Sequence, residues 1–190
     1  MLWSCLVTML VPLSSQGVNP QLTLQLLLPS LPIQHLVKMI TDSRSEKMAH
    51  LASYPHAEIA WYFVKTREQY RLSGRIVVVS STTQDKALQN ARKQQWGNLS
   101  DNAKVQFLWP FPKQPSPPDQ DPNVFTPELP TGAAGGPPDM FCLLLMRVEE
   151  VDHLELKPNP QQRTTHSRKG EEEGEGEEGE GGWEVTKVNP

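Results

Sequence analysis

Two β-rich runs joined by a short polar turn constrain the fold more than any other feature of this sequence. Residues 56–81 read HAEIAWYFVKTREQYRLSGRIVVVSS, and every second residue from Ile59 to Phe63 is large and apolar. The returning run ends in four apolar residues at 76–79. Alternation with a period of two is typical of a strand with one buried face. We therefore predict an antiparallel hairpin, with Gly74 marking a bulge or a close approach by another backbone or a ligand.

Further elements follow the hairpin. Apolar residues recur at helical spacing in 83–96, and 99–109 indicates a second short helix. Residues 140–156, MFCLLLMRVEEVDHLEL, predict two more strands, the first fully apolar as in the centre of a sheet. The end of the chain, GWEVTKVNP, predicts a terminal strand. Many short strands with few helices favour an antiparallel α+β domain or a small barrel.

Two segments have compositions that do not favour regular structure. Residues 110–138 contain ten prolines, so we predict a long surface loop. Residues 170–182 contain seven Glu and no cation, so we predict a disordered acidic tract. The formal net charge is −4, but without this tract 18 Lys and Arg face 15 Asp and Glu. A mildly basic body suits an anionic small molecule and excludes the dense basic patch of a nucleic-acid binder.

The cysteines, the histidines and the N-terminus exclude several other classes. Cys5 and Cys142 lie in apolar runs without metal-ligand spacing, and the five histidines are scattered, so we predict no metal site and a reducing compartment. The first 37 residues contain no charged side chain, and residues 1–17 resemble the apolar region of a signal peptide. They lack its cationic start, and the apolar run is too short for a membrane span. We therefore expect a cytoplasmic protein with no membrane association.

Residues 41–55, TDSRSEKMAHLASYP, place polar side chains at the start of a predicted helix. One interpretation is a capping box, in which Ser43 and Glu46 each accept from the other's backbone N–H. The other is an anion site, because a helix N-terminus presents unpaired N–H groups and a partial positive charge. The polar residues that capping leaves unused are Thr41, Arg44, Ser45 and Lys47. The segment alone leaves both interpretations open.

Five blocks of sequence, in order, resemble one family. They are TDSRSEK, AEIAWYFVKTREQYRLSGRI, R…QQWGNLSD…QFLWPFP, VDHLEL and the terminal W…KVNP. The order and content are similar to the pyridoxamine 5'-phosphate oxidase-like FMN-binding family, in its cyanobacterial-type branch. The resemblance runs from about Met39 to Pro190, with the proline loop and acidic tract as inserts. It implies a split β-barrel that forms a homodimer and holds FMN in a cleft between the subunits.

The resemblance assigns cofactor roles residue by residue. Thr41, Ser45 and Lys47 match the segment that grips the FMN phosphate, which favours the anion site at the helix start. Gln69 matches a glutamine that hydrogen-bonds the flavin ring from the second subunit, and Arg163 matches an arginine near the flavin. Glu46 departs from the pattern, because the better-known oxidases carry Arg there.

The substrate side of the pattern is weaker. Arg92 matches an arginine that holds the phosphate of a pyridoxine-type substrate, a vitamin B6 compound. The Tyr and Ser that would assist it are Leu88 and Trp96 here, and Leu154 stands where those oxidases have Trp. The sequence identifies no catalytic residue.

The pattern also differs upstream. The family precedes the phosphate-gripping segment with two strands that carry Arg-x-Val-Val/Leu-Arg/Lys, and residues 1–38 contain nothing like it. We therefore predict an atypical, irregular segment at 1–38 before a split-barrel domain at 39–190 that is incomplete at its N-terminus.

Two function classes follow from the resemblance. The first is an FMN-dependent oxidase of the pyridoxamine 5'-phosphate oxidase type. The second is a flavin-binding protein of the same family without turnover. The missing cationic strand and the altered surroundings of Arg92 favour the second class for this chain.

Overall fold

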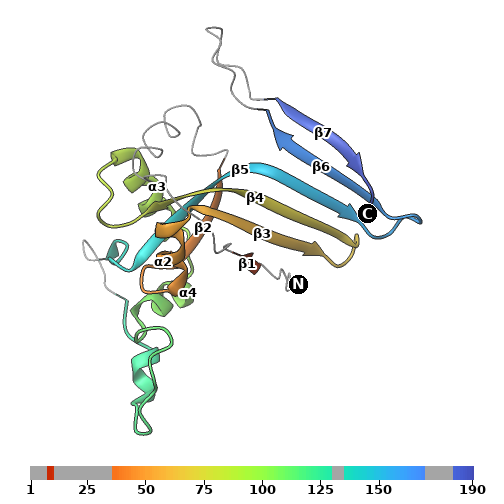
Figure 1. The fold of residues 1–190 in the computed structure, drawn as a ribbon. Helices are drawn as coiled ribbons and strands as arrows, with labels where there is room; N and C mark the ends of the chain where they lie inside the picture. Colours follow the sequence, from red (N-terminus) through yellow and green to blue (C-terminus); the bar gives the residue numbers. More distant parts are fainter. Residues whose placement is uncertain (1–7, 11–35, 130–134, 170–181) are drawn as a thin grey trace.

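The fold is one antiparallel sheet with its helices gathered at one end (Figure 1). The computed structural model describes residues 36–129, 135–169 and 182–190, and the backbone of residues 8–10. Within these residues seven strands form the sheet, in the order β1-β3-β4-β5-β6-β7, and β2 pairs with β5 outside this path. The α+β antiparallel class predicted from the sequence is confirmed.

The strands are β1 (Thr8–Leu10), β2 (Val37–Asp42), β3 (His56–Phe63), β4 (Glu68–Val79), β5 (Phe141–Glu155), β6 (Gln162–Arg168) and β7 (Trp183–Val188). The helices are α2 (Glu46–Ser53), α3 (Lys86–Gly97) and α4 (Asp101–Val105), with short 3-10 turns η2 (Gln106–Leu108) and η3 (Pro122–Phe125). The predicted hairpin, the two helices after it and the terminal strand are therefore all present. Apart from η3, the described part of the proline loop is irregular.

Strand β5 is the centre of the sheet. It pairs with β4 along almost its whole length, while its other edge pairs first with β2 and then with β6. The prediction of two strands in 140–156 was wrong, because β5 is one strand of 15 residues. The polar residues in its middle fall at a bulge, where the register shifts but the pairing with β4 continues. A bulge of this kind breaks the apolar pattern without ending the strand.

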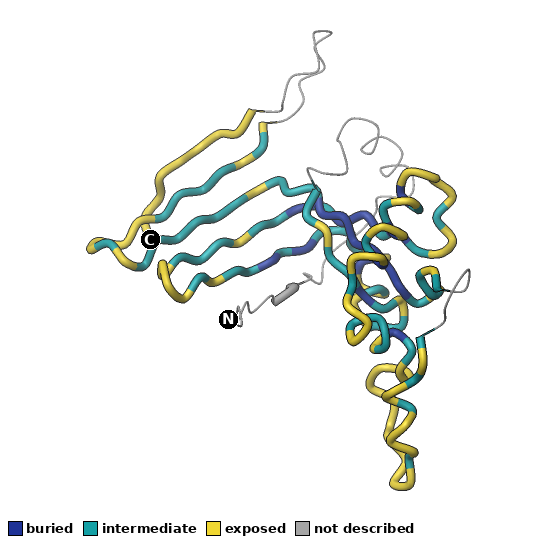
Figure 2. The backbone as a smooth tube through the Cα atoms, turned by 180° about the vertical axis from the view of Figure 1, so that it is seen from behind, coloured by how far each residue is buried: buried dark blue, intermediate teal, exposed yellow. Residues whose placement is uncertain are grey.

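The core lies on both faces of the first half of β5. Leu144 and Met146 pack in a cluster with Leu51 of α2, and Leu143 and Leu145 pack in a second cluster with Leu88 of α3. Because both faces are covered, every residue from Phe141 to Met146 is buried. Figure 2 shows this burial concentrated at the helical end. The apolar run FCLLLM is therefore a central strand, as predicted.

The other end of the sheet is open. Every residue of β7 is exposed, and Trp183, Val185 and Val188 are among the large apolar side chains left uncovered. Strand β6, whose sequence is QRTTHSR, was not predicted. Its side chains are polar or charged, so the apolar alternation that identifies a half-buried strand is absent from its sequence.

Some predictions fall on residues outside the described part of the chain. These are the signal-like residues 1–7 and 11–17, Cys5, and residues 170–181 of the acidic tract. Within the segment expected to be irregular, β1 pairs with β3 and β2 begins at Val37. No helix in the described residues is long and apolar enough to cross a membrane.

Gly74 lies at a close approach between β4 and β5. The register shifts between Ser73 and Gly74, which confirms the predicted bulge. A Cβ at position 74 would lie 2.0 Å from the backbone oxygen of Arg147 and 2.9 Å from its backbone carbon. The predicted close approach by another backbone is therefore also present, and only glycine fits it.

Gly74→Ala is expected to lower the free energy of unfolding by at least about 1–3 kcal/mol, the usual cost of overpacking, because backbone atoms cannot rotate away. Urea denaturation followed by circular dichroism measures it. Gly97→Ala is the matched control: a Cβ there meets no described atom within 4 Å, and the smaller entropy of the unfolded chain should stabilise the protein by about 0.4–1 kcal/mol. Equal effects at the two positions would contradict the close approach.

Candidate functional site

The segment that joins β2 to α2 brings two hydroxyl groups together. Thr41 is 5% exposed in β2, and Ser45 is the N-cap residue of α2. Their oxygens lie 3.3 Å apart, and the Ser45 side chain makes no capping bond to the helix. Lys47 is exposed in the first turn of α2. Two hydroxyls, a cation and the N-terminus of an eight-residue helix form a donor set that fits a phosphate group.

The capping-box interpretation of Ser43 and Glu46 is wrong. The helix begins at Glu46, so its N-cap is Ser45. The backbone N–H of Ser43 instead donates to the carbonyl of Met140 at 2.8 Å. The Glu46 carboxylate accepts from Lys113, and this hydrogen bond lowers the pKa of Glu46. Neither residue therefore caps the helix.

Arg44 does not add a spare cation to the site. Its Nε donates to both carboxylate oxygens of Asp42, at 2.9 and 3.1 Å, and its Nη2 donates to Asp42 Oδ2 at 2.6 Å. The hydrogen bonds to Asp42 raise the pKa of Arg44. This pair was not predicted from the sequence, although a spacing of two residues in a turn allows it.

The residues predicted to contact the flavin ring lie in one row across the sheet. Gln69 of β4 faces Leu154 of β5, which in turn faces Arg163 of β6. Residues opposite one another in an antiparallel sheet point to the same face. Arg163 also donates to Asp152, at 2.9 and 2.7 Å, and these bonds lower the pKa of Asp152. The structure therefore brings Gln69 and Arg163 together and fixes the arginine side chain.

Within one chain this row lies far from the hydroxyl pair. Thr41 is opposite Cys142 and Gln69 is opposite Leu154, positions twelve residues apart on β5. At about 3.3 Å per residue the separation is roughly 40 Å. The two groups also lie on different faces of the sheet. Met39, on the same face of β2 as Thr41, and Leu72 of β4 both pack against the cluster that contains Leu51 of α2. Gln69 lies three residues before Leu72 in β4 and therefore points to the opposite face. No single flavin nucleotide spans both groups in one chain.

Arg92 is built into the core. It is 4% exposed, its Nε donates to the carbonyl of Phe141 at 2.9 Å, and its Nη2 donates to the carbonyl of Pro138 at 2.6 Å. Burial lowers its pKa. Leu88 and Trp96, the residues that replace its expected partners, are also buried in core clusters. Arg92 therefore connects α3 to the first residue of β5 and to the loop before it. Its predicted contact with a substrate stays a prediction.

Tyr70, Glu68 and His153 form a polar and aromatic cluster that was not predicted from the sequence. The Tyr70 hydroxyl donates to Glu68 Oε2 at 2.8 Å, and His153 Nε2 lies 3.2 Å from the same oxygen. The rings of Tyr70 and His153 stack at 4.2 Å. They lie on the face opposite to Gln69, where Trp61 and Phe63 help to line a shallow hollow of about 430 Å³. Desolvation raises the pKa of Tyr70.

Comparison with known proteins connects this geometry to a family. The sequence model described as "Pyridoxamine 5'-phosphate oxidase, FMN-binding domain" matches residues 22–80. The pyridoxine/pyridoxamine 5'-phosphate oxidase 2 of Arabidopsis thaliana is 31% identical over 154 residues, which cover 81% of this chain and 72% of that protein. The chain belongs to the pyridoxamine 5'-phosphate oxidase family. The predicted resemblance and FMN as the cofactor are thereby confirmed. The match includes residues 22–38, which we had assigned to the atypical segment.

Solved structures of related proteins agree on the fold. A pyridoxamine 5'-phosphate oxidase-related, FMN-binding protein of Nostoc punctiforme has a TM-score of 0.70 and 37% identity, covering 82% of this chain and 73% of that one. PhzG of Burkholderia lata has a TM-score of 0.59 at 16% identity, covering 82% and 69%, and shows likeness of fold alone. The chain therefore has the split-barrel fold of this family.

Proposed function

We propose that this chain binds FMN in a site shared by two subunits, with the phosphate at the start of α2 and the ring near Gln69 and Arg163 of the partner. The observation that carries the proposal is the pair of hydroxyls of Thr41 and Ser45, 3.3 Å apart at a helix N-terminus. Lys47 supplies the positive charge that a dianionic phosphate needs to offset its desolvation. FMN, when bound, supplies the hydride-accepting chemistry.

The shared site explains why the predicted residues fall into two distant groups. One subunit offers the hydroxyl pair and Lys47, and the other offers Gln69 and Arg163. The exposed apolar side chains of β7, of which Val185 is 58% exposed, also favour association with a second copy. On this proposal each homodimer contains two equivalent sites.

We expect the folded protein to be a dimer by light scattering. The Lys47→Ala variant and the Gln69→Ala variant should each bind FMN more weakly than wild type. In the homodimer of each variant, both sites carry the substitution. A mixed dimer of the two variants has one doubly altered site and one unaltered site, so co-expression should restore wild-type affinity at about half of its sites. A monomer that binds FMN, or no restoration in isolated mixed dimers, would contradict the shared site.

The name of a relative and the surroundings of Arg92 bear on the reaction class. The Arabidopsis relative is named as an oxidase of pyridoxine and pyridoxamine 5'-phosphates, so we propose the same phosphorylated compounds as the candidate substrates. Arg92, the residue expected to hold their phosphate, donates to two backbone carbonyls. This arrangement favours the alternative proposal, a flavin-binding member of the family without turnover.

Lys47→Ala is expected to weaken FMN binding by about 1.5–3 kcal/mol, the usual scale for a hydrogen bond to a charged group. Riboflavin, which lacks the phosphate, should bind both proteins equally. Fluorescence titration with each ligand measures this. Lys93→Ala is the matched control, because Lys93 is an exposed lysine of α3. If FMN and riboflavin bind wild type and variant alike, the phosphate site is wrong.

Little or no oxidation of pyridoxine or pyridoxamine 5'-phosphate is expected from this chain. The hydroxyl groups that hold the substrate phosphate in the family pattern are missing here, and the Arg92 guanidinium already donates to two backbone carbonyls. The substrate would therefore be poorly positioned, and a misplaced reacting carbon can lower the rate by about a hundredfold. Hydrogen peroxide release in air with excess FMN measures turnover. The Arabidopsis relative is the positive control, and robust release by this chain would establish the oxidase class instead.

A further inference from the structure

The turn that presents the phosphate-binding hydroxyls is held by a residue outside the proposed contact set. The Arg44 guanidinium donates from Nε and Nη2 to the Asp42 carboxylate, and Asp42 Oδ1 also accepts from the Arg44 backbone N–H at 2.8 Å. The Ser45 N–H donates to the Asp42 carbonyl at 3.0 Å. These bonds close the chain between Thr41 and Ser45 into one defined turn.

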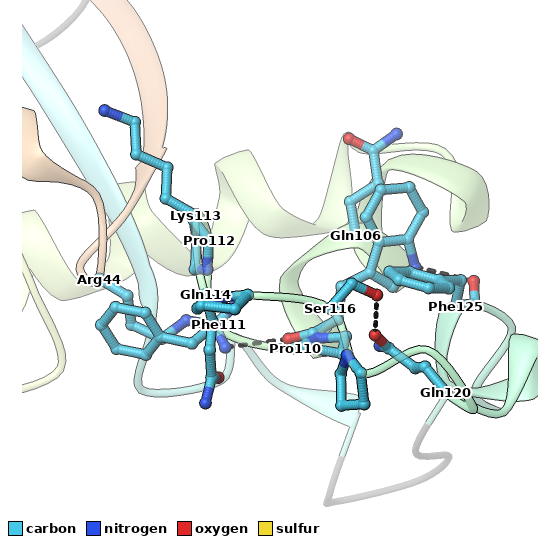
Figure 3. Close-up of a pocket in the computed structure, with 13 residues that line it drawn as sticks. Arg44, Gln106, Pro110, Phe111, Pro112, Lys113, Gln114, Ser116, Gln120 and Phe125 are labelled. Carbon is cyan, nitrogen blue, oxygen red and sulfur yellow. Dashed lines mark hydrogen bonds between the residues drawn. The ribbon is translucent and has the colours of Figure 1, made fainter.

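The same guanidinium reaches a separate part of the chain. Its Nη1 donates to the carbonyl of Trp109 at 2.9 Å, and its Nη2 approaches the carbonyl of Phe107 at 3.3 Å. Residues 109–129 form an arm that projects away from the sheet (Figure 1). Figure 3 shows Arg44 beside Phe111. Both residues line a hollow of about 540 Å³ that is formed mainly by this arm. Arg44 therefore joins the base of the arm to the turn.

We propose that Arg44 is a positioning residue, which couples the base of the arm to the FMN phosphate site by fixing the turn that presents Thr41 and Ser45. This inference rests on the proposed function. One guanidinium binds Asp42 and the carbonyls of Phe107 and Trp109 at the same time, so movement of the arm base moves the turn. The distance between the hydroxyls then depends on residues more than 60 positions away in the sequence.

The contacts need the shape of arginine as well as its charge. A planar guanidinium can serve a carboxylate through two parallel bonds and still have donors for carbonyls in the same plane, whereas a lysine ammonium is a compact point charge. The side chains of Arg44 and Asp42 are 19% and 16% exposed, so solvent competes little for the bonds between these two residues. Lysine at position 44 would keep the charge near the phosphate and lose the geometry.

The test measures the ratio of riboflavin to FMN dissociation constants in the full chain, for wild type, Arg44→Ala and Arg44→Lys. In both variants this ratio should fall at least about fivefold below the wild-type value, which is the lower end of typical couplings between linked sites. Riboflavin affinity should stay unchanged. Lys113→Gln is the matched control: it removes a cation next to the same helix start and leaves the turn intact, because its pair with Glu46 is exposed. This control should keep the preference.

The outcomes separate the two claims. If wild type shows no preference for FMN, the proposed phosphate site is wrong and the role of Arg44 with it. If wild type prefers FMN and Arg44→Lys keeps that preference, Arg44 acts as a charge and the positioning role is wrong. Loss of riboflavin binding together with FMN binding in both variants would show general damage to the fold and would also overturn it. A selective loss in both variants, with Lys113→Gln unchanged, supports it.

Discussion

The pairing of β4 with β5 is the interaction on which the rest of the structure depends. The first half of β5 is buried on both faces, between α2 and α3, and apolar burial of this kind is the main driving force for folding. Its register against β4 includes a bulge at Gly74. There the two backbones come so close that no residue with a Cβ atom would fit. Because β2 and β6 attach to the other edge of β5, this register also sets the positions of both predicted groups of cofactor residues.

The length of β5 has a functional consequence. It carries Thr41 beside one end and the row of Gln69 and Arg163 beside the other. A long strand inside a single small domain cannot bring its two ends together, so one chain cannot complete the proposed site. The proposed association of two copies would complete the site, and β7 offers exposed apolar side chains for such a contact.

Two arginines show how a charged residue in a binding motif can serve the backbone. Arg92 satisfies the carbonyls of Pro138 and Phe141, and Arg44 satisfies those of Phe107 and Trp109. Loop carbonyls near a core need donors, since an unpaired buried polar group is costly. The arginine fork can serve two acceptors at once. Residue type and spacing alone do not distinguish this use from phosphate binding.

The sequence by itself determined the hairpin, the central apolar strand, the helices and the bulge at Gly74, because these depend on local periodicity and on the conformational freedom of glycine. It also determined the family, which the comparisons confirmed. Only the tertiary structure decided that residues 140–156 form one strand, that QRTTHSR is a strand, and that Glu46 pairs with Lys113 instead of capping its helix. It alone showed that Arg44 and Arg92 bind carbonyls. Such partners lie tens of residues away along the chain, and their meeting depends on the register of β5, which no local pattern encodes.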